Sequence, residues 1–129
     1  MYVALYAPNG RAAALDARIA RTPAARAMGF TGRTSLAPDE AILFAFPEDT
    51  RTPFTLAATG VALDLAFFDA AGRMVGAHYG ARARDPRPYG APGPYRYALE
   101  VPAGWLAAHG VGGPGTVIAW SSGGFTQPV

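Results

Sequence analysis

Asp64 is the residue of this chain that raises the question of chemistry most directly. It lies in the stretch TGVALDLAFFD, at 59–69, where a period of two places Leu63 and Leu65 on one face of a strand and Asp64 on the other. Its neighbours along the strand are apolar, and an unpaired carboxylate is costly to bury among them. Asp64 is therefore a catalytic acid or base, a ligand-binding group, or one half of an ion pair that holds the fold together.

We favour the structural role for Asp64, because a general acid or base needs a histidine, a lysine or a second carboxylate within reach. The neighbouring segments offer mainly alanine and phenylalanine. The planar fork of an arginine matches a carboxylate bidentately and suits a buried pair. We expect Arg33, in the turn GFTGR, to form a structural ion pair with Asp64, and Arg26 is the second choice.

Glu100 is another carboxylate inside an apolar run, YALEV. Alternation places Arg96 and Glu100 on one face, but the two are too far apart on a single strand to pair directly. We expect a cross-strand arginine or a backbone donor to satisfy the Glu100 carboxyl, in preference to a catalytic role.

The other residue types that carry chemistry form no recognisable motif. His78 and His109 are the only histidines, cysteine is absent, and no H-x-x-x-H spacing occurs, so we expect neither a metal site nor a cofactor. Ser35, Ser121 and Ser122 are the only serines, and none lies in a G-x-S-x-G motif. We therefore assign no catalytic residue.

The segment ARARDPRPYGAPGPYRY, at 81–97, is the strongest candidate for a binding surface. It interleaves arginine with tyrosine in a stiff frame of proline and glycine, as surfaces for sugars, peptides and single strands do. We expect a ligand to contact Tyr89 and Tyr95 together with Phe54, Thr59 and Asp64 at the neighbouring sheet edge. The alternative is a solvent loop whose tyrosines pack over the sheet.

The overall composition limits the class of partner. The formal net charge is only +2, all 11 basic residues are arginines, and Asp85 interrupts the basic run, so nucleic acid is disfavoured. A small molecule or a carbohydrate is the expected partner. No apolar run approaches the roughly 18 residues of a membrane span, and no basic residue precedes the apolar start MYVALY. We expect a soluble, cytoplasmic protein, or an exported one if an upstream signal was removed.

Short elements must position all these residues. The pattern predicts seven or eight strands and two brief helices, the first between Thr22 and Gly29 and the second at 104–109. The expected strands lie at 2–7, 11–20, 41–46, 54–58, 61–69, 73–79, 95–101 and 116–120. This pattern predicts an all-β fold, mainly an antiparallel β-sandwich or partly open barrel, as a single domain at 1–129 with a C-terminal tail at 121–129.

The order of several short segments resembles that of one known family. The segments are TPAARAMGFTGRTSL (22–36), ILFAFP (42–47), LDLAFFDAAGRMV (63–75), PGPYRYALEVPAGW (92–105) and the HGVGGPG that precedes the last strand. Together they resemble the DUF192 family, a domain of unknown function also called uncharacterised protein family 0127, over residues 18–119. The resemblance implies a small, mostly antiparallel β-sandwich and no particular activity.

One departure from the family pattern bears on a binding site. Members typically show an aromatic-Met-Lys-Asn-Thr cluster before the Leu-Asp pair, and that polar cluster would make a plausible site. The matching positions here are Thr55, Leu56, Ala57, Ala58 and Thr59, so alanines replace the lysine and the asparagine. The resemblance therefore implies that a pocket relying on this cluster is blunted in this chain.

Three functions remain open on the sequence. The first is a non-catalytic module that binds a small ligand or partner, and it predicts a concave surface carrying Tyr89 or Tyr95. The second is a hydrolase- or transferase-type enzyme with Asp64 as acid or base, and it predicts Asp64 in an open pocket without an arginine nearby. The third is a structural interaction domain, which predicts a contiguous exposed apolar patch.

Overall fold

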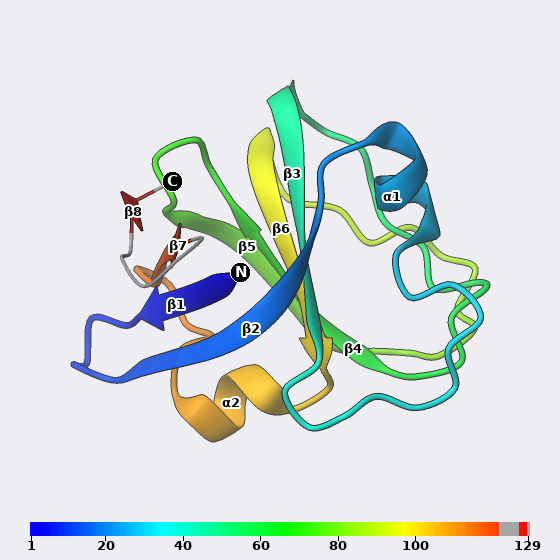
Figure 1. Cartoon of the computed structure of the whole chain (residues 1–129), viewed down its shortest axis with the longest axis horizontal. Coiled ribbons are helices and arrows are strands. Elements are labelled where there is room, and N and C mark those ends of the chain that lie inside the picture. Colours follow the sequence, from blue (N-terminus) through cyan, green and yellow to red (C-terminus); the bar gives the residue numbers. More distant parts are fainter. Residues whose placement is uncertain (122–126, 129) are drawn as a thin grey trace.

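A computed structural model of the chain describes residues 1–121 and 127–128, in which one strongly curved sheet carries two short helices (Figure 1). The helices are α1 (Pro23–Met28) and α2 (Trp105–His109). The strand order is β5-β4-β6-β3-β2-β1-β7-β8. The strands are β1 (Tyr2–Tyr6), β2 (Ala12–Ala20), β3 (Ala41–Thr50), β4 (Leu63–Phe68), β5 (Met74–Ala81), β6 (Tyr95–Pro102), β7 (Val117–Ser121) and β8 (Gln127–Pro128).

The long strand β2 joins the two halves of the sheet, because its two ends pair with different strands. Its first part runs antiparallel to β1, and its last part runs parallel to β3. At the other side of the sheet, an isolated bridge between Arg73 and Val117 connects the β4–β5 hairpin to β7. The sheet therefore curls into a partly open barrel, which confirms the predicted mostly-β fold with two short helices.

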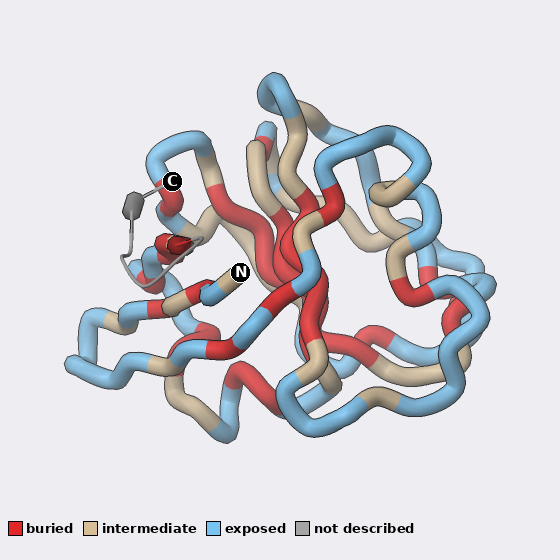
Figure 2. Tube along the Cα trace, in the orientation of Figure 1, coloured by how far each residue is buried: buried red, intermediate tan, exposed pale blue. Residues whose placement is uncertain are grey.

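The central strands are apolar on both faces because each face covers a separate core. All six residues of β4 are buried, and Figure 2 shows the buried segments gathered in the middle of the sheet. Ala66 and Phe68 point into the barrel, whereas Leu63, Leu65 and Phe67 pack into a second cluster on the outer face. A strand buried on both sides loses the simple apolar–polar alternation that a half-exposed strand shows.

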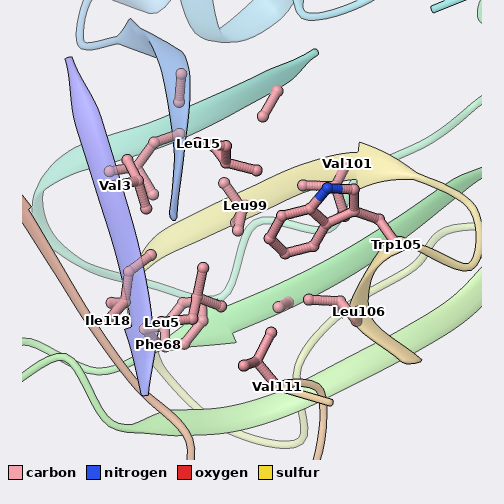
Figure 3. Close-up of a cluster of buried hydrophobic side chains, with 14 residues drawn as sticks. Val3, Leu5, Leu15, Phe68, Leu99, Val101, Trp105, Leu106, Val111 and Ile118 are labelled. Atoms are coloured by element: carbon pink, nitrogen blue, oxygen red, sulfur yellow. The ribbon is translucent and has the colours of Figure 1, made fainter. Parts of the chain in front are cut away.

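Side chains fill the interior of the barrel. Val3, Leu5 and Ile118 from the β1–β7 half meet Leu99 from β6, and Trp105 from α2 closes one end (Figure 3). The indole N–H of Trp105 donates to Asp39 Oδ1 at 2.9 Å. Because this interior is packed, a ligand site has to lie outside the barrel.

The second core is covered by α1 and by long connecting segments. Thr22 caps α1, since its Oγ1 accepts the backbone N–H of Ala25 at 3.1 Å, and Pro23 occupies the first turn. The helix ends at Gly29, whose backbone has φ +47° and ψ −130°. None of the residues of α1 is buried, so the helix forms a thin lid over the outer face.

Two predicted features of the chain differ from the structure. Residues 54–58 form no strand; Phe54 makes only an isolated bridge with Tyr89, while the Thr55 Oγ1 accepts the N–H of Ala57 and turns the chain. Leu56 is thereby inserted into the second core. Residues 47–49, which lie beyond the expected strand at 41–46, belong to β3, where the register with β6 shifts between Ala45 and Thr50. Proline is compatible with such an irregular pairing.

The predicted C-terminal tail, at 121–129, lies mostly outside the described residues. Ser121 ends β7, and Gln127 and Pro128 pair with that strand as β8.

Candidate functional site

A cavity of about 380 Å³ lies between α1, the outer face of β3 and β6, and the segment that follows β3. Its walls are mainly apolar and aromatic, with a few polar groups. The residues that line it are Pro23, Arg26, Ala27, Met28, Gly29, Thr31, Phe44, Phe46, Thr52, Pro53, Phe54, Thr55, Thr59 and Glu100.

Glu100 provides the carboxyl group of this cavity. It lies on β6 opposite Ile42 of β3 and Leu65 of β4, both of which belong to the outer core. The residue is only 5% exposed. Within the described part of the chain, no hydrogen bond or ion pair involves its carboxyl oxygens, and neither oxygen is sealed from solvent, so they open into the cavity. A buried carboxyl with no protein partner is rare in folded proteins.

Burial raises the pKa of Glu100 to about 8, and the positive charge of Arg18 opposes this effect only in part. Arg18 lies in register with Ile42, so it stands two strands away from Glu100, roughly 10 Å at the usual strand spacing. Its Nη2 donates to the carbonyl of Gly29 at 2.7 Å. Arg18 is thus a cross-strand arginine, but its guanidinium bonds the Gly29 carbonyl. The prediction that a cross-strand arginine or a backbone donor satisfies the Glu100 carboxyl is wrong for the described residues.

Phenylalanine rings form the walls around this carboxyl. The rings of Phe44 and Phe54 meet edge to face at 4.9 Å between centroids. The ring of Phe46 carries the guanidinium of Arg26, which lies 4.8 Å from its centroid. The Nη1 of Arg26 donates to the carbonyls of Arg21 and Ala45, at 2.5 and 3.1 Å, so α1 is tied to β3 at the cavity rim.

Gly29 keeps the space above Glu100 open. Its positive φ of +47° is a backbone conformation that other residues rarely adopt. A Cβ at this position would lie 3.4 Å from the Phe44 ring and 3.8 Å from Glu100 Oε1. Any side chain here would therefore fill part of the cavity beside the carboxyl.

Asp64 lies elsewhere and is fully used by the backbone. Its Oδ1 accepts the N–H of Gly80 at 2.8 Å, and its Oδ2 accepts those of Gly104 and Leu106 at 3.1 and 3.2 Å. It thus caps the start of α2, where Gly104 has no side chain to do so. Asp64 is 1% exposed and does not line the cavity.

The predicted ion pair between Asp64 and Arg33 does not form. Arg33 instead pairs with Glu40, with Nη–Oε distances of 2.6 and 2.8 Å, near the surface. This Glu40 contact raises the pKa of Arg33 and lowers that of Glu40. The three backbone N–H groups take the place that an arginine was expected to have beside Asp64. These donors lie far from Asp64 in the sequence, so no local pattern predicts them.

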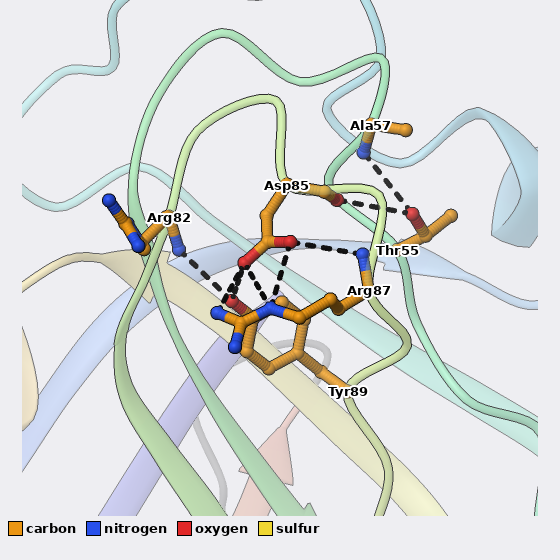
Figure 4. A network of polar contacts seen from close by, with 6 residues as sticks. All are labelled: Thr55, Ala57, Arg82, Asp85, Arg87 and Tyr89. Carbon is orange, nitrogen blue, oxygen red and sulfur yellow. Dashed lines mark hydrogen bonds and ion pairs between the residues drawn. The ribbon is translucent and has the colours of Figure 1, made fainter.

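The arginine–tyrosine segment is closed on itself by a polar network (Figure 4). The Asp85 carboxylate accepts hydrogen bonds from the Arg87 guanidinium at 2.7 Å and from the Tyr89 hydroxyl at 2.5 Å. These contacts hold the pKa of Asp85 well below its usual range. The Tyr89 hydroxyl, which was expected to contact a ligand, thus bonds within the segment, as does the Arg87 guanidinium.

The five residues expected to contact a ligand are only partly brought together. Phe54 and Thr59 line the cavity. Tyr89 exchanges backbone hydrogen bonds with Phe54 at 2.7 and 2.8 Å, and the buried Tyr95 ring lies 6.4 Å behind Phe54, so both support the wall from outside the lining. Burial raises the pKa of Tyr95 to about 12, and its hydroxyl donates to the Thr52 carbonyl. Asp64 does not belong to this group.

Several cavity residues were not predicted to bind a ligand, among them Glu100, Arg26, Gly29, Phe44 and Phe46. The available signal was Glu100 itself, a carboxylate inside the apolar run YALEV. The positions of the family's polar cluster border the same cavity, since Thr55 and Thr59 line it.

The described residues form neither a cluster of metal ligands nor a membrane-spanning helix. No three of their histidine, aspartate and glutamate side chains come together as a metal site. None of the helices in that part of the chain has the length and apolar character needed to cross a bilayer.

The chain is similar in sequence and fold to known proteins. A candidate transcription regulator from Sinorhizobium meliloti 1021 is similar at 29% identity and a TM-score of 0.85, over 91% of this chain and 90% of that one. A protein of unknown function from Novosphingobium aromaticivorans DSM 12444 is similar at 28% identity and a TM-score of 0.86, over 93% and 84%. Comparison with curated proteins gives no match. The family model for DUF192, described as Uncharacterized ACR, matches residues 5–120, and the chain therefore belongs to the DUF192 family.

Proposed function

We propose that this chain is a non-catalytic module that binds a small molecule in the cavity over Glu100. The observation that carries the proposal is the buried carboxyl of Glu100, which opens into a preformed cavity and has no partner among the described residues. Burial deprives the charged form of this carboxyl of solvation and raises its pKa to about 8. A ligand that donates hydrogen bonds to the carboxyl would replace that solvation, and binding sites of mainly apolar lining with a few placed polar groups have this character.

The shape and lining of the cavity support a small ligand with an apolar body. The rings of Phe44, Phe46 and Phe54 offer flat apolar contact, and a volume of about 380 Å³ accommodates a molecule with one ring and a short substituent. The rim residues on α1 are exposed, so the cavity is reached from solvent without opening the barrel.

Catalysis by Glu100 is the second candidate, because its pKa of about 8 is that of a carboxyl able to act as a general acid near neutral pH. The lining supplies no histidine, lysine, cysteine or serine to complete a catalytic set; besides Glu100 and Arg26 its polar side chains are threonines. The enzyme hypothesis based on Asp64 gains no support, since its carboxylate is occupied by three backbone donors. We therefore favour binding.

A structural interaction domain gains less support than binding. The exposed large apolar side chains of the described residues include Tyr6 and Val117, which are opposite one another on β1 and β7, with Tyr2 farther along β1. This cluster is small, and isolated apolar residues on a surface are ordinary.

The test is to map small aromatic probes onto the protein by backbone NMR. We would titrate monocyclic compounds with cationic, neutral and anionic substituents, and follow the amide signals of Gly29, Thr59 and Glu100. The proposal expects at least one probe to shift these three signals saturably.

A pair of matched variants shows whether the probe occupies the cavity. Ala27 and Ala24 are both exposed on α1, but only Ala27 lines the cavity. Ala27→Trp should narrow the entrance and weaken the probe's affinity at least about tenfold, whereas Ala24→Trp should leave it unchanged. The binding proposal is overturned if no probe shifts the three signals, or if both variants bind as the parent does.

A further inference from the structure

We propose that the cavity over Glu100 selects an organic cation, an amidinium or primary ammonium group carried on a flat apolar body. This inference rests on the proposed function and names the ligand class of the same cavity. Three observations support it. None of the described residues donates a hydrogen bond to the Glu100 carboxyl, aromatic rings line the cavity, and Arg18 and Arg26 donate to backbone carbonyls.

None of the described residues donates a hydrogen bond to the Glu100 carboxyl, so its ligand has to bring the donors. Its strand neighbours Ile42 and Leu65 offer only apolar side chains on this face. An amidinium or ammonium group supplies N–H donors and a positive charge together, and charge-assisted hydrogen bonds to a carboxylate are about twice as strong as neutral ones. Glu100 is also the only carboxylate in the lining, so the cation has one place to bind.

The walls favour a cation that has an aromatic or similarly flat body. A ring face carries negative partial charge, and a cation within about 6 Å of a ring centroid is attracted to it. Phe44 and Phe54 lie edge to face beside the carboxyl, and the guanidinium of Arg26 already uses the Phe46 ring in this manner. The same rings stack on the apolar part of the ligand.

The two arginines nearest the cavity are held away from Glu100 by backbone carbonyls. Arg26 Nη1 bonds the carbonyls of Arg21 and Ala45, and Arg18 Nη2 bonds that of Gly29. Neither guanidinium therefore neutralises the carboxyl, although Arg18 lowers its pKa to some degree. The cation that pairs with the Glu100 carboxyl can therefore come from the ligand.

Binding of a cation is then coupled to the release of a proton. The free carboxyl, with a pKa of about 8, is mostly protonated at neutral pH, and it must ionise to pair with a cation. Affinity for a permanently charged probe should therefore rise roughly tenfold per pH unit below about pH 8 and level off above it.

Other groups near this face could also titrate or carry charge. They are Arg18 on β2, Arg26 on α1, His78 on β5, Tyr95 on β6, and Arg33 with its partner Glu40 on the segment before β3. The arginines stay charged at all relevant pH values, and burial raises the pKa of Tyr95 to about 12, well above the pH range tested. A Glu100→Gln variant separates any contribution of His78 from that of Glu100, because it removes only the latter.

The experiment uses three probes that share one ring and differ in head group: benzamidine, which stays cationic from about pH 6 to about pH 9, neutral benzamide, and anionic benzoate. Their affinities for the full chain are measured by calorimetry across this range, in buffers of different ionisation enthalpy. We expect benzamidine to bind best, with an affinity that rises with pH and with release of close to one proton below about pH 7.

Variants assign the effect to Glu100. Glu100→Gln keeps a neutral side chain of the same shape, so it should fold and should lose the preference for benzamidine and the proton release. Glu40→Gln, which alters a glutamate outside the cavity, should retain both. The inference is overturned if benzamide or benzoate binds this cavity as tightly as benzamidine, in which case the proposed function stands. It is equally overturned if benzamidine binding is independent of pH or is unchanged by Glu100→Gln. If none of the three probes binds, both the cation site and the proposed binding function are overturned.

Discussion

Asp64 accepts three backbone hydrogen bonds, whereas Glu100, which is almost as deeply buried, accepts none within the described part of the chain. The donors around Asp64 satisfy its carboxyl oxygens inside the barrel and fix the start of α2. Burial holds the Glu100 carboxyl in its neutral form near pH 7. Two acidic residues at similar depth thus have different roles, one in the fold and one at the cavity.

The raised pKa of Glu100 predicts a pH-dependent stability. The folded protein holds this proton up to about pH 8, whereas the unfolded chain loses it near the ordinary glutamate pKa of 4.5. The contribution of Glu100 to stability is therefore fully present below about pH 4.5 and is lost progressively as pH rises toward about 8. Urea unfolding should show the parent losing a few kcal/mol over this interval from this group.

The Glu100→Gln variant is the control for that prediction. It cannot ionise, so the difference in unfolding free energy between variant and parent should grow in the variant's favour from about pH 5 to about pH 8.5. A difference that stays constant across this range would show that Glu100 is ionised in the folded protein at neutral pH.

Asp64→Asn should destabilise the protein strongly without affecting the cavity. The amide keeps one acceptor oxygen but turns its NH₂ toward a backbone N–H, which leaves a buried donor without a partner. We expect a loss of about 3 kcal/mol in urea unfolding.

A surface aspartate gives the comparison for Asp64. Asp49 pairs with Arg96 at 3.0 Å and is largely exposed, so Asp49→Asn should cost less than about 1 kcal/mol. If Asp64→Asn costs no more than Asp49→Asn, the hydrogen bonds to α2 and β5 do not carry the role assigned to them.

At the level of elements, the cavity exists because α1 and the segment 52–59 fold over strands that are already apolar on their outer face. The helix has no buried residue of its own, and Thr22 only caps its first turn. It is attached to the sheet by Arg26, which donates to the Ala45 carbonyl, and by Arg18, which donates to the Gly29 carbonyl. The strands beneath it, β3, β4 and β6, are buried on both faces. The floor of the site is therefore rigid and its lid is weakly held.

Native-state hydrogen exchange should resolve this difference. Amides of β4 and β6 should exchange only through global unfolding, while those of α1 should exchange through local opening, on the order of a hundredfold faster or more. Saturating a cavity ligand should slow exchange in α1 selectively. Equal protection in α1 and β4 would mean that the helix is an integral part of the core and not a lid.

The elements were predictable from the sequence where local signals sufficed. Turn residues and apolar runs located most strands and both helices, because proline, glycine and Thr22 act on their immediate neighbours. Residues 54–58 were predicted as a strand, yet of these residues only Leu56 is fully buried in the core, and the chain turns around it. Asp64 and Glu100 were both recognised as buried acids, but the donors to Asp64 come from segments distant in sequence, and no local pattern specifies that they reach Asp64 and not Glu100.

On the scale of the whole molecule, the curled sheet has a packed interior on one face and the cavity on the other. Its interior is packed with side chains from β1, β2, β3, β4, β6 and β7, and its outer face carries the second core and the cavity. The two similar structures, at TM-scores of 0.85 and 0.86, share this fold over most of their length.

The most direct test of the account is the titration of the glutamate side chains by ¹³C NMR. The chain has only three glutamates, Glu40, Glu48 and Glu100, so their carboxyl signals can be assigned by substitution. We expect Glu100 to titrate near pH 8 and Glu40 below its usual range, since Arg33 holds it ionised. Saturating benzamidine should move the Glu100 midpoint to lower pH and leave Glu40 in place. A Glu100 midpoint near 4.3, the value of an exposed glutamate, or one that benzamidine does not move, would contradict the account.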